Sequence, residues 1–393
     1  MNTEIINENH RLDEDISEIN EWEDLNAKTE LLRGIYASGF EKPSPIQRKA
    51  ILPLFSKKDI IAQAQSGTGK TACFSIGALQ LIDTSNKEPQ VIILSPTREL
   101  SIQSKKVIDT IGNLIHGLST HLMVGGTSTI DSIKEIRNNP PQIIVGCPGR
   151  IHYMLKRNLL SSSSLKLLIL DEADELLSSG FKDQIYNIFQ FMPSKIQVAL
   201  FSATMPNELY SLTEKFMIHP TKILVKNEQL TLEGIRQYYV ALDNDEVKYD
   251  TLKDIYSSLT VSQSIIYCNS VKRVNDLFVA MNNDNYPVCQ IHSNMDKEER
   301  LKNYEEFKNG KHRVLISSNV TARGIDIQQV STVINFDLPN CVHNYLHRIG
   351  RSGRWGRKGV GINFVTQRDM NQLKYIEQHY HTQIIELTEN WSE

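Results

Sequence analysis

The residues best suited to chemistry lie in two short motifs about a hundred positions apart. The first, Ala64-Gln-Ser-Gly-Thr-Gly-Lys-Thr71, joins an apolar run to a stretch with helical spacing of apolar residues. Its glycines let the backbone wrap phosphates, and backbone N–H groups at a helix N-terminus favour an anion. The second, Leu170-Asp-Glu-Ala-Asp174, ends another apolar run in two adjacent carboxylates. Together they predict a site for a nucleoside triphosphate, a magnesium ion and an attacking water.

Side-chain chemistry suggests a role for each residue of these motifs. We expect Lys70 to reach the β- and γ-phosphates and the Thr71 hydroxyl to bind Mg²⁺. Asp171 is expected to hold the same ion through water, and Glu172 to orient and deprotonate the attacking water. The segment that wraps the phosphates comprises Ser66, Gly67, Thr68, Gly69, Lys70 and Thr71. Taken singly, the motifs could also be a Gly-rich turn without ligand and a solvated acidic turn at a helix start.

Apolar runs that alternate with helical patterns predict two α/β domains. The runs typical of strands are 59–64, 91–95, 121–124, 142–146, 167–170 and 197–201 in the first half, and 236–242, 263–268, 288–291, 313–317, 332–336 and 360–365 in the second. Such alternation predicts parallel sheets covered by helices on both faces. The polar segment 226–234 is the predicted linker. The expected organisation is therefore an acidic tail over 1–20, an N-terminal domain over 21–225 and a C-terminal domain over 235–393.

Composition limits the class of protein. A length of 393 residues favours two domains. No apolar run approaches the ~20 residues of a membrane span, and the acidic N-terminus lacks a signal-peptide pattern. The five cysteines are scattered without a CxxC pair, which is typical of reduced intracellular thiols. Residues 1–25 hold nine acids against one base, a net charge of −8, so the −3 of the whole chain leaves +5 for the rest. This predicts a disordered acidic tail on a mildly basic body.

The motifs, taken in order, resemble those of the DEAD-box ATP-dependent RNA helicases, and within them the translation initiation factor 4A-like group. In the first half they are Gly39-Phe-Glu-Lys-Pro-Ser-Pro-Ile-Gln47, Pro96-Thr-Arg-Glu-Leu100, Gly125-Gly126, Pro148-Gly-Arg150, Asp171-Glu-Ala-Asp174 and Ser202-Ala-Thr204. In the second half they are Ile265-Ile-Tyr-Cys-Asn-Ser270, Ala322-Arg-Gly-Ile-Asp326 and His347-Arg-Ile-Gly-Arg-Ser-Gly-Arg354. Each motif alone could arise by chance, but the ordered set is specific and covers roughly residues 20–387.

The resemblance implies two tandem RecA-like doubly wound domains that use ATP and Mg²⁺. It implies that hydrolysis is coupled to domain closure, to single-stranded RNA binding and to local, non-processive unwinding of short duplexes. By the same resemblance Phe40 and Gln47 recognise adenine, Asp326 holds the ribose, and Arg351 and Arg354 act as arginine fingers. On composition alone, Phe40 could instead belong to the core, and the arginines to a basic surface.

The resemblance also implies RNA contacts and partners. The expected RNA contacts are Thr97, Arg98, Gly126, Gly149 and Arg150 in the first domain and Asn269, Arg300, Ser318 and Gly324 in the second. Contacts of these kinds to phosphates predict sequence-tolerant, salt-dependent binding. Asp174, Ser202 and Thr204 are expected to couple the two ligand sites, unless the Ser-Ala-Thr segment only ends a strand. The resemblance further implies a monomer, a scaffold partner of the initiation factor 4G type and a cytoplasmic location. The nucleus is the alternative location.

Four sites depart from the 4A-like pattern. Cys147 replaces a threonine, Ser293-Asn294 replaces Gly-Asp, Lys297 stands where glutamine is common, and Asn319 replaces an aspartate. All the phosphate-site residues are intact, so we expect altered RNA coupling and not a loss of hydrolysis. Two other functions stay open, an ATP-gated RNA clamp that turns over rarely and a DNA-directed motor of the same architecture. The Asp-Glu-Ala-Asp spelling argues against the second of these.

Overall fold

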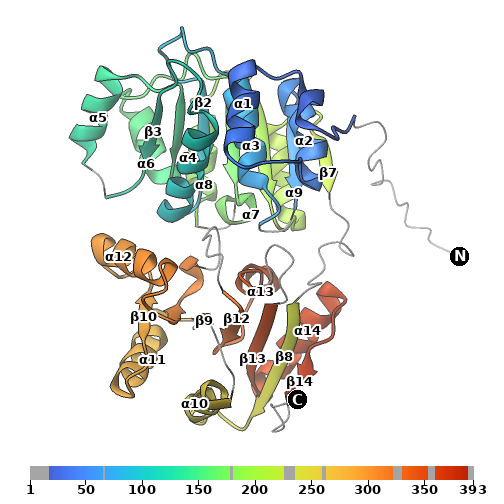
Figure 1. The fold of residues 1–393 in the computed structure, drawn as a ribbon, viewed down its shortest axis with the longest axis vertical. Helices are drawn as coiled ribbons and strands as arrows, with labels where there is room; N and C mark the ends of the chain where they lie inside the picture. Colours follow the sequence, from blue (N-terminus) through green and yellow to red (C-terminus); the bar gives the residue numbers. More distant parts are fainter. Residues whose placement is uncertain are drawn as a thin grey trace, which may run out of the picture. The chain divides into compact units, whose positions relative to one another are not determined.

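The structure, a computed structural model, describes residues 17–64, 67–126, 128–177, 180–224, 235–258, 263–321, 330–352 and 359–387. The chain divides into two compact units between residues 225 and 226, apart from the short segment 65–67. Each unit is a parallel sheet with helices on both faces (Figure 1). The predicted linker 226–234 and residues 1–16 of the predicted tail lie outside the described residues.

The first unit is built on a seven-stranded sheet in which every pair is parallel. Its strands are β1 (Ile60–Gln63), β2 (Val91–Leu94), β3 (Thr120–Met123), β4 (Ile143–Gly146), β5 (Leu167–Asp171), β6 (Gln197–Ser202) and β7 (Thr221–Leu224). They follow the order β3-β4-β2-β5-β6-β1-β7 across the sheet. Six were predicted as apolar runs, because strands covered on both faces have few polar positions. The seventh, β7, is an edge strand and lacks this signature.

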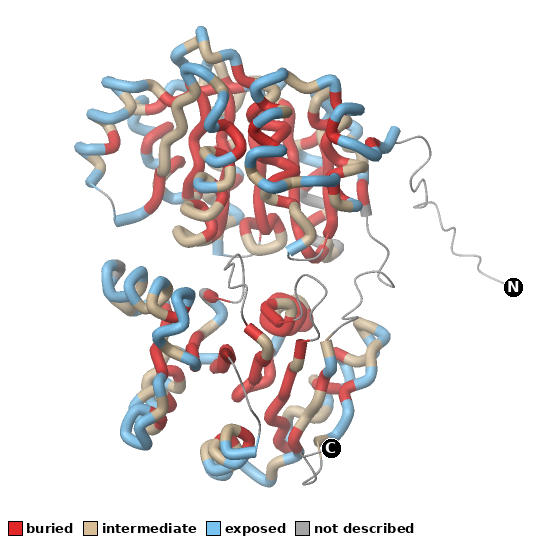
Figure 2. The backbone as a smooth tube through the Cα atoms, viewed as in Figure 1, coloured by how far each residue is buried: buried red, intermediate tan, exposed pale blue. Residues whose placement is uncertain are grey.

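Helices cover both faces of this sheet. They are α1 (Thr29–Ala37), α2 (Pro45–Phe55), α3 (Lys70–Leu81), α4 (Arg98–Ile111), α5 (Thr129–Asn138), α6 (Pro148–Lys156), α7 (Ala173–Leu176), α8 (Lys182–Phe189) and α9 (Asn207–Phe216), with a 3-10 turn η1 (Trp22–Leu25) ahead of them. Successive strand side chains point to opposite faces. Ile60 and Ala62 therefore join the core under α1–α4, whereas Ile61 joins the core under α6–α9. Figure 2 shows the result, with buried strands and helices that expose their outer sides.

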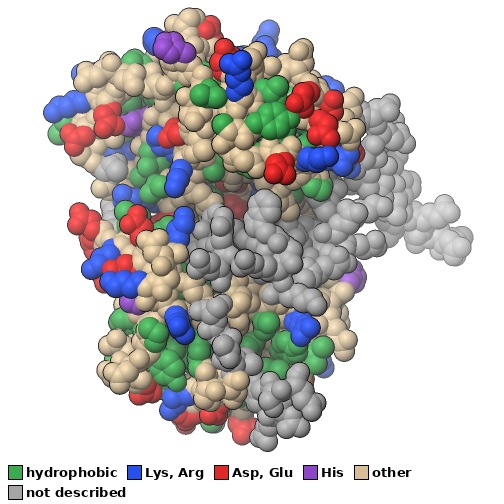
Figure 3. Space-filling model, viewed as in Figure 1, with side chains coloured by type: hydrophobic (Ala, Val, Ile, Leu, Met, Phe, Trp, Pro, Cys, Tyr) green, Lys and Arg blue, Asp and Glu red, His purple; other side chains and the backbone are tan. Residues whose placement is uncertain are grey.

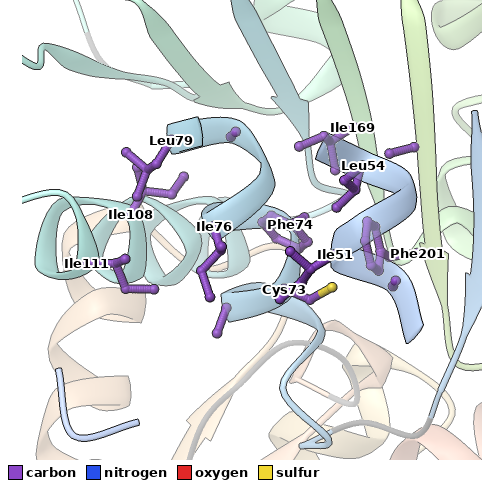
Figure 4. Packing of buried hydrophobic residues seen from close by; sticks show 14 of the residues in the cluster. Ile51, Leu54, Cys73, Phe74, Ile76, Leu79, Ile108, Ile111, Ile169 and Phe201 are labelled. Carbon is purple, nitrogen blue, oxygen red and sulfur yellow. The ribbon is translucent and has the colours of Figure 1, made fainter. Parts of the chain in front are cut away.

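The core under α1–α4 fixes the helix that follows the phosphate loop. Phe74 of α3 packs edge-on against Phe201 of β6, with the ring centroids 5.4 Å apart. Ile51 and Leu54 of α2 lie beside them (Figure 4). Helices α2 and α3 approach closely at Gly77, where a Cβ would lie 2.7 Å from Leu54 Cδ1. The start of α3 is therefore held by packing against both a helix and the sheet.

The second unit repeats this plan. Its strands are β8 (Ile235–Leu242), β9 (Ser264–Tyr267), β10 (Val288–Ile291), β11 (Val314–Ser317), β12 (Thr332–Asn335), β13 (Gly359–Thr366) and β14 (Ile385–Glu386). Their order is β10-β11-β9-β12-β13-β8-β14, again with parallel pairs only. The edge strand β14 was not predicted, because it is two residues long and both are exposed. Both domains thus have the helix-covered parallel sheets that the alternating pattern predicted and the doubly wound fold that the resemblance implied.

The helices of the second unit also cover two faces. They are α10 (Lys248–Ser258), α11 (Val271–Asn283), α12 (Lys297–Lys308), α13 (Val342–Ile349) and α14 (Met370–Tyr380), with 3-10 turns η3 (Asn319–Thr321) and η4 (Gln367–Asp369). Helices α10 and α11 share one core with Ile266 of β9. Helices α13 and α14 share the other with Ile265. Among the described residues, no helix combines the length and apolarity needed to cross a membrane.

All five cysteines are free thiols. Cys73, Cys268 and Cys289 are buried, and burial raises the pKa of each thiol, which keeps it protonated. Cys147 is partly buried, with its Sγ 3.7 Å from the hydroxyl of Ser101.

Candidate nucleotide and RNA sites

The candidate residues of the first domain follow strands at the carboxyl edge of its sheet. Strands β3, β4 and β2, which are neighbours, lead into the loops predicted to contact RNA. The next three neighbours, β5, β6 and β1, lead into the acidic motif, the Ser-Ala-Thr segment and the phosphate loop. Since all pairs are parallel, these loops meet at one edge, where open α/β sheets bind ligands. RNA candidates thus occupy one half of the edge and nucleotide candidates the other.

The phosphate loop has the backbone that its glycines predict. Gly67 and Gly69 have φ angles of 84° and 95°, in the left-handed region that a side chain disfavours. Gly69 precedes the first residue of α3, Lys70, which is buried. The Lys70 ammonium donates a hydrogen bond of 2.7 Å to the carbonyl of Ala64, so the lysine folds back across its own loop. Thr68 and Thr71 flank this turn, whereas Ser66 lies outside the described residues.

The acidic motif presents a carboxylate suited to a cation. Asp171 ends β5 and is 2% exposed, and its Oδ1 accepts the N–H of Glu172 at 3.0 Å. Its Oδ2 is buried and accepts no hydrogen bond within the described part of the chain. Burial and the neighbouring Glu172 raise the pKa of Asp171, while Lys70 lowers it. A divalent cation beside Asp171 would stabilise the charged carboxylate and so offset the effect of burial on its pKa. Asp171 and the Thr71 hydroxyl therefore fit magnesium, an ion that prefers oxygen ligands.

Glu172 itself has an unusual backbone. Its φ of 50° is left-handed, which non-glycine residues rarely adopt. Such strain persists only where surrounding structure enforces it, and it is common at functional sites. The turn directs the chain from β5 into α7 immediately after the carboxylates.

The adenine-recognition motif is tied to the phosphate loop. Gln47 is buried; it accepts the N–H of Ser44 at 2.7 Å and donates to the carbonyl of Gly69 at 3.1 Å. Phe40 is partly buried against the core, and its carbonyl accepts the indole N–H of Trp22 at 3.0 Å. Trp22 is fully buried. The two interpretations of Phe40 are therefore compatible, since part of its surface packs and part stays accessible.

The Ser-Ala-Thr segment contacts the acidic motif. The Thr204 hydroxyl donates a hydrogen bond of 2.6 Å to Oδ2 of Asp174. The hydroxyl of Ser202 accepts the backbone N–H of Asp174 at 3.4 Å and that of Thr204 at 3.3 Å. The segment therefore does more than end β6, because it links the loops that follow β5 and β6. Asp174 is three residues beyond the end of β5, the strand that adjoins the RNA half of the edge.

The predicted RNA residues of the first domain are brought together by contacts between their loops. Thr97 caps α4 by accepting the N–H of Leu100 at 3.3 Å. Arg98 donates to the carbonyl of Gly125 at 3.4 Å, which joins the loop after β2 to the loop after β3. Arg150, in the first turn of α6, donates to the hydroxyl of Thr129.

Two glycines complete this group. Gly126 has a φ of 84°, so the turn after β3 requires a residue without a side chain. Gly149 lies in the first turn of α6, and a Cβ there would lie 3.4 Å from Oε1 of Gln184. Both leave the backbone accessible to a closely approaching strand.

In the second domain, three predicted RNA residues are described and occupy equivalent places. Asn269 follows β9, Ser318 follows β11, and Arg300 lies in α12 after β10. These three strands are neighbours in the sheet. The Asn269 amide donates to the carbonyl of Leu338 at 2.9 Å, and its backbone N–H donates to a carboxylate oxygen of Asp337 at 3.0 Å. Gly324 lies outside the described residues.

The two described arginines of the last motif, Arg348 and Arg351, do not form a basic surface. Arg348 is fully buried and Arg351 is 2% exposed. The Arg351 guanidinium donates to the carbonyl of His347 at 3.2 Å. Arg354 and Asp326 lie outside the described residues.

Asp337 and the contacts of Arg348 were missed by the sequence reasoning. Asp337 follows the apolar run 332–336 as Asp171 follows 167–170, so the same signal was available for both. The partners of Arg348 could not be anticipated, because they come from distant segments of the chain.

Two tandem doubly wound domains, with a glycine phosphate loop in the first and motifs at the carboxyl edges of both sheets, are the arrangement expected of the helicase class of nucleoside triphosphatases. Comparison with known proteins agrees. The DEAD/DEAH box helicase family matches residues 44–212, and the helicase conserved C-terminal domain matches residues 247–356.

Individual relatives cover nearly the whole chain. The ATP-dependent RNA helicase eIF4A of Pyricularia oryzae is 50% identical over 372 residues, 95% of this chain and 93% of the relative. The eukaryotic initiation factor 4A-3 of Nicotiana plumbaginifolia is 49% identical over 375 residues, 95% of each chain. The solved structure of S. cerevisiae Dbp5 bound to RNA and ADP BeF3 has a TM-score of 0.88 at 34% identity, covering 95% of this chain and 97% of that one. The chain belongs to the DEAD-box helicase family, and within it to the initiation factor 4A-like group.

Proposed function

We propose that this chain is an ATP-dependent RNA helicase of the initiation factor 4A type, which couples ATP hydrolysis to local, non-processive unwinding of short RNA duplexes. Relatives half identical to it are named ATP-dependent RNA helicases, and the similar Dbp5 was solved with RNA and a nucleotide analogue. The observation that carries the proposal is the contact of Thr204 with Asp174, because it ties the nucleotide half of the sheet edge to the loop after β5, the strand that adjoins the RNA half.

The chemistry assigned to the first domain is positioning and proton transfer. The backbone of Gly67 to Thr71 and the Lys70 ammonium hold the phosphates of ATP. Glu172 orients the attacking water and accepts its proton. Magnesium, held by Thr71 and Asp171, supplies positive charge to the phosphate oxygens when it is bound. Phe40 and Gln47 select adenine, which is consistent with the bond from Gln47 to the phosphate loop.

The second domain completes the reaction in this proposal. Arg351 and Arg354 stabilise charge that develops on the transferred phosphoryl group, and Asp326 holds the ribose. ATP and RNA each contact both domains, so each binds the closed state better and shifts the population toward it. The RNA strand is bent as the domains close, and a short duplex then separates. Hydrolysis resets the protein to the open state.

RNA is held by its phosphates. In the first domain the contacts are Thr97, Arg98, Gly126, Gly149 and Arg150, and in the second they are Asn269, Arg300, Ser318 and Gly324. Contacts of this kind position a strand without reading its sequence. We also assign to this chain a monomeric state, a cytoplasmic location and a scaffold partner of the initiation factor 4G type, on the basis of its group alone.

The decisive experiment measures steady-state ATP hydrolysis with no nucleic acid, with single-stranded RNA and with single-stranded DNA, at two salt concentrations. Wild type should be stimulated strongly by RNA, less at high salt, and Glu172→Gln should be inactive throughout. Unwinding of a short RNA duplex is then measured with ATP. Equal stimulation by DNA would indicate the DNA-directed motor, and slow turnover with long ATP-dependent retention of RNA would indicate the clamp.

A further inference from the structure

The two sheets have the same strand order, which pairs each strand of one domain with a strand of the other. Position by position, β1 corresponds to β8, β5 to β12, β6 to β13, and the RNA-half strands β3, β4 and β2 to β10, β11 and β9. The half of the second sheet formed by β12, β13 and β8 is therefore the counterpart of the nucleotide half. Neither the proposed function nor the comparisons give this counterpart a role.

Buried residues at the counterpart match those of the nucleotide site in type and place. Lys70 is the first residue of the helix after β1, and Lys248 is the first residue of the helix after β8. Both lysines are buried, with Lys248 1% exposed. Asp171 ends β5, and Asp337 follows the end of β12. The Lys248 ammonium lies 3.3 Å from a carboxylate oxygen of Asp337.

The loop before Lys248 excludes a nucleotide. Its sequence, Asp243-Asn-Asp-Glu-Val247, contains no glycine, so it cannot wrap phosphates as 64–71 can. The Asp245 carboxylate lies 2.8 Å from the Lys248 ammonium and so takes the place of a phosphate oxygen. Burial acts to raise the pKa of Asp245, but hydrogen bonds from Lys248 and Arg368 outweigh it and lower the pKa to about 2. The anion beside Lys248 is thus the Asp245 carboxylate of the chain itself and not a phosphate.

Asp337 and Asp245 share the cations of one ion network. Arg273 lies 3.0 Å from the Asp337 carboxylate and 3.6 Å from that of Asp245, and Arg368 pairs with Asp245. Asp337 is 8% exposed, so both of its cationic partners act in a partly desolvated setting. Removing the Asp337 charge would leave the buried Lys248 with one anion in place of two.

Asp337 also holds Asn269, the predicted RNA contact in the loop after β9. Its second carboxylate oxygen accepts the backbone N–H of Asn269 at 3.0 Å. Its backbone carbonyl accepts the Arg348 guanidinium at 2.8 Å, and the same guanidinium donates to Oδ1 of Asn269 at 2.7 Å. Both ends of Asn269 are therefore held by groups anchored to one aspartate.

We propose that Asp337 is a positioning residue for RNA binding: in the second domain the counterpart of the nucleotide site has become an internal ion network that holds Asn269 in place. The inference rests on the proposed function, since it requires Asn269 to contact RNA. RNA affinity then depends on the carboxylate of Asp337, which does not itself contact RNA.

The test is Asp337→Asn in the full chain, which keeps the size of the side chain and removes its charge. The RNA concentration for half-maximal ATPase stimulation should rise about tenfold, because the hydrogen bond that orients Asn269 loses its charge assistance. The rate at saturating RNA and the KM for ATP should not change, since no nucleotide contact is altered. An unchanged RNA requirement would overturn the inference.

Asp245→Asn is the matched control. Asp245 pairs with Lys248, Arg273 and Arg368 but makes no contact with Asn269 in the described structure. If the network matters only for folding, both variants should lower the melting temperature and alter the RNA requirement alike. Because Asp337 contacts Asn269 directly and Asp245 does not, the inference requires a clearly larger rise in the RNA requirement in Asp337→Asn than in Asp245→Asn.

Two further variants separate the possible failures. If Asp337→Asn does not fold, Asp337→Glu keeps the charge but displaces it, and its RNA requirement should still rise while kcat holds; no rise overturns the inference. Asn269→Ala tests the underlying site: if it binds RNA as wild type does, the proposed role of Asn269 is wrong, and the inference falls with it. Loss of affinity in Asn269→Ala but not in the Asp337 variants would defeat the inference alone.

Discussion

Arg348 is a buried cation held by neutral groups among the described residues. Its guanidinium donates to side-chain oxygens of Asn319, Asn335 and Asn269 at 2.8, 3.1 and 2.7 Å, and to the carbonyl of Asp337. Burial lowers its pKa to about 10, although the group stays charged at neutral pH. Asn319 is one of the four departures from the 4A-like pattern, which has an aspartate at this position. The substitution therefore removes a charge from next to a buried arginine.

Restoring that charge with Asn319→Asp should stabilise the second domain. The hydrogen bond from the charged Arg348 to a neutral amide oxygen becomes an ion pair, worth about 1–2 kcal/mol more, although burying the new carboxylate offsets part of this gain. Urea unfolding should show a higher midpoint, and the RNA requirement for ATPase stimulation should fall because Arg348 also holds Asn269. Asn309→Asp, at the exposed C-terminal end of α12, adds the same charge away from Arg348; it should not raise the midpoint and should leave the RNA requirement unchanged. A lower midpoint for Asn319→Asp would refute the charge argument.

Thr204→Ala should uncouple hydrolysis from unwinding. The substitution removes the hydroxyl that donates to Asp174 but leaves the phosphate loop and Glu172 untouched. RNA-stimulated ATPase should stay within about threefold of wild type, while the rate of duplex unwinding should fall at least about tenfold, the size expected for loss of a charged hydrogen bond. Thr110→Ala removes an exposed hydroxyl bonded only to a helix carbonyl and serves as the control. Unwinding at the wild-type rate would show that the contact does not couple the sites.

Residue identities were predictable where one local motif defines the chemistry, as for Lys70 and Asp171. The support of these residues was not, because it comes from long-range contacts. The bond of Gln47 to the phosphate loop spans 22 positions, and that of Arg348 to Asn269 spans 79. A single sequence carries no signal for such pairs. Asp337 was missed for a different reason, since its motif lacks the glycine loop that drew attention to its counterpart.

At the scale of elements, the join of the phosphate loop to α3 depends on a missing side chain. A Cβ on Gly69 would lie 2.6 Å from the amide nitrogen of Gln47, and the φ of 95° disfavours any side chain. Gly69→Ala should therefore displace Gln47 or the loop and raise the KM for ATP at least about tenfold. The KM is measured by steady-state ATPase at saturating RNA.

The control for that substitution is Gly180→Ala, where the added methyl meets open space. Its KM for ATP should match wild type. An unchanged KM in Gly69→Ala would mean that the loop can shift without cost and that the close approach of Gln47 has no functional role.

Twelve of the fourteen described strands were predicted, and the two misses are β7 and β14. Central parallel strands such as β5 are covered on both faces and give continuous apolar runs. The edge strand β7 begins with Thr221 and Lys222 and so lacks a continuous apolar run, and the edge strand β14 has only two residues, both exposed. Their formation depends on the neighbouring strand, which local periodicity does not reveal. The alternating pattern also does not predict the order of the strands across each sheet. This order divides the edge of the first sheet into nucleotide and RNA halves.

At the scale of the whole molecule, RNA affinity has to come from local placement of charge. The chain carries a net charge of −3, and basic and acidic side chains are interspersed over the face seen in Figure 3. Attraction to a polyanion therefore depends on a few arginines near the strand, not on the overall field. Arg98, Arg150 and Arg300 are the described arginines among the predicted contacts.

Each arginine that neutralises an RNA phosphate should contribute to the salt dependence of binding. For single strands the logarithm of the affinity falls with the logarithm of salt concentration with a slope of about −0.7 per contact, so three contacts give about −2. Arg150→Gln should reduce the steepness by about 0.7 and weaken binding of all sequences alike. The measurement is fluorescence anisotropy of labelled single-stranded RNA with a non-hydrolysable ATP analogue, at several salt concentrations.

The same helix provides the control for this measurement. Arg157 caps the far end of α6, where its guanidinium lies over the ring of Tyr153, 5.8 Å from the centroid. Arg157→Gln removes an equal charge from the same element but from the opposite end to the RNA loops, so its slope should match wild type. Equal slopes for all three proteins would show that Arg150 does not neutralise a phosphate. Equal reductions in both variants would mean that overall charge, and not placement at the carboxyl edge of the sheet, sets the affinity.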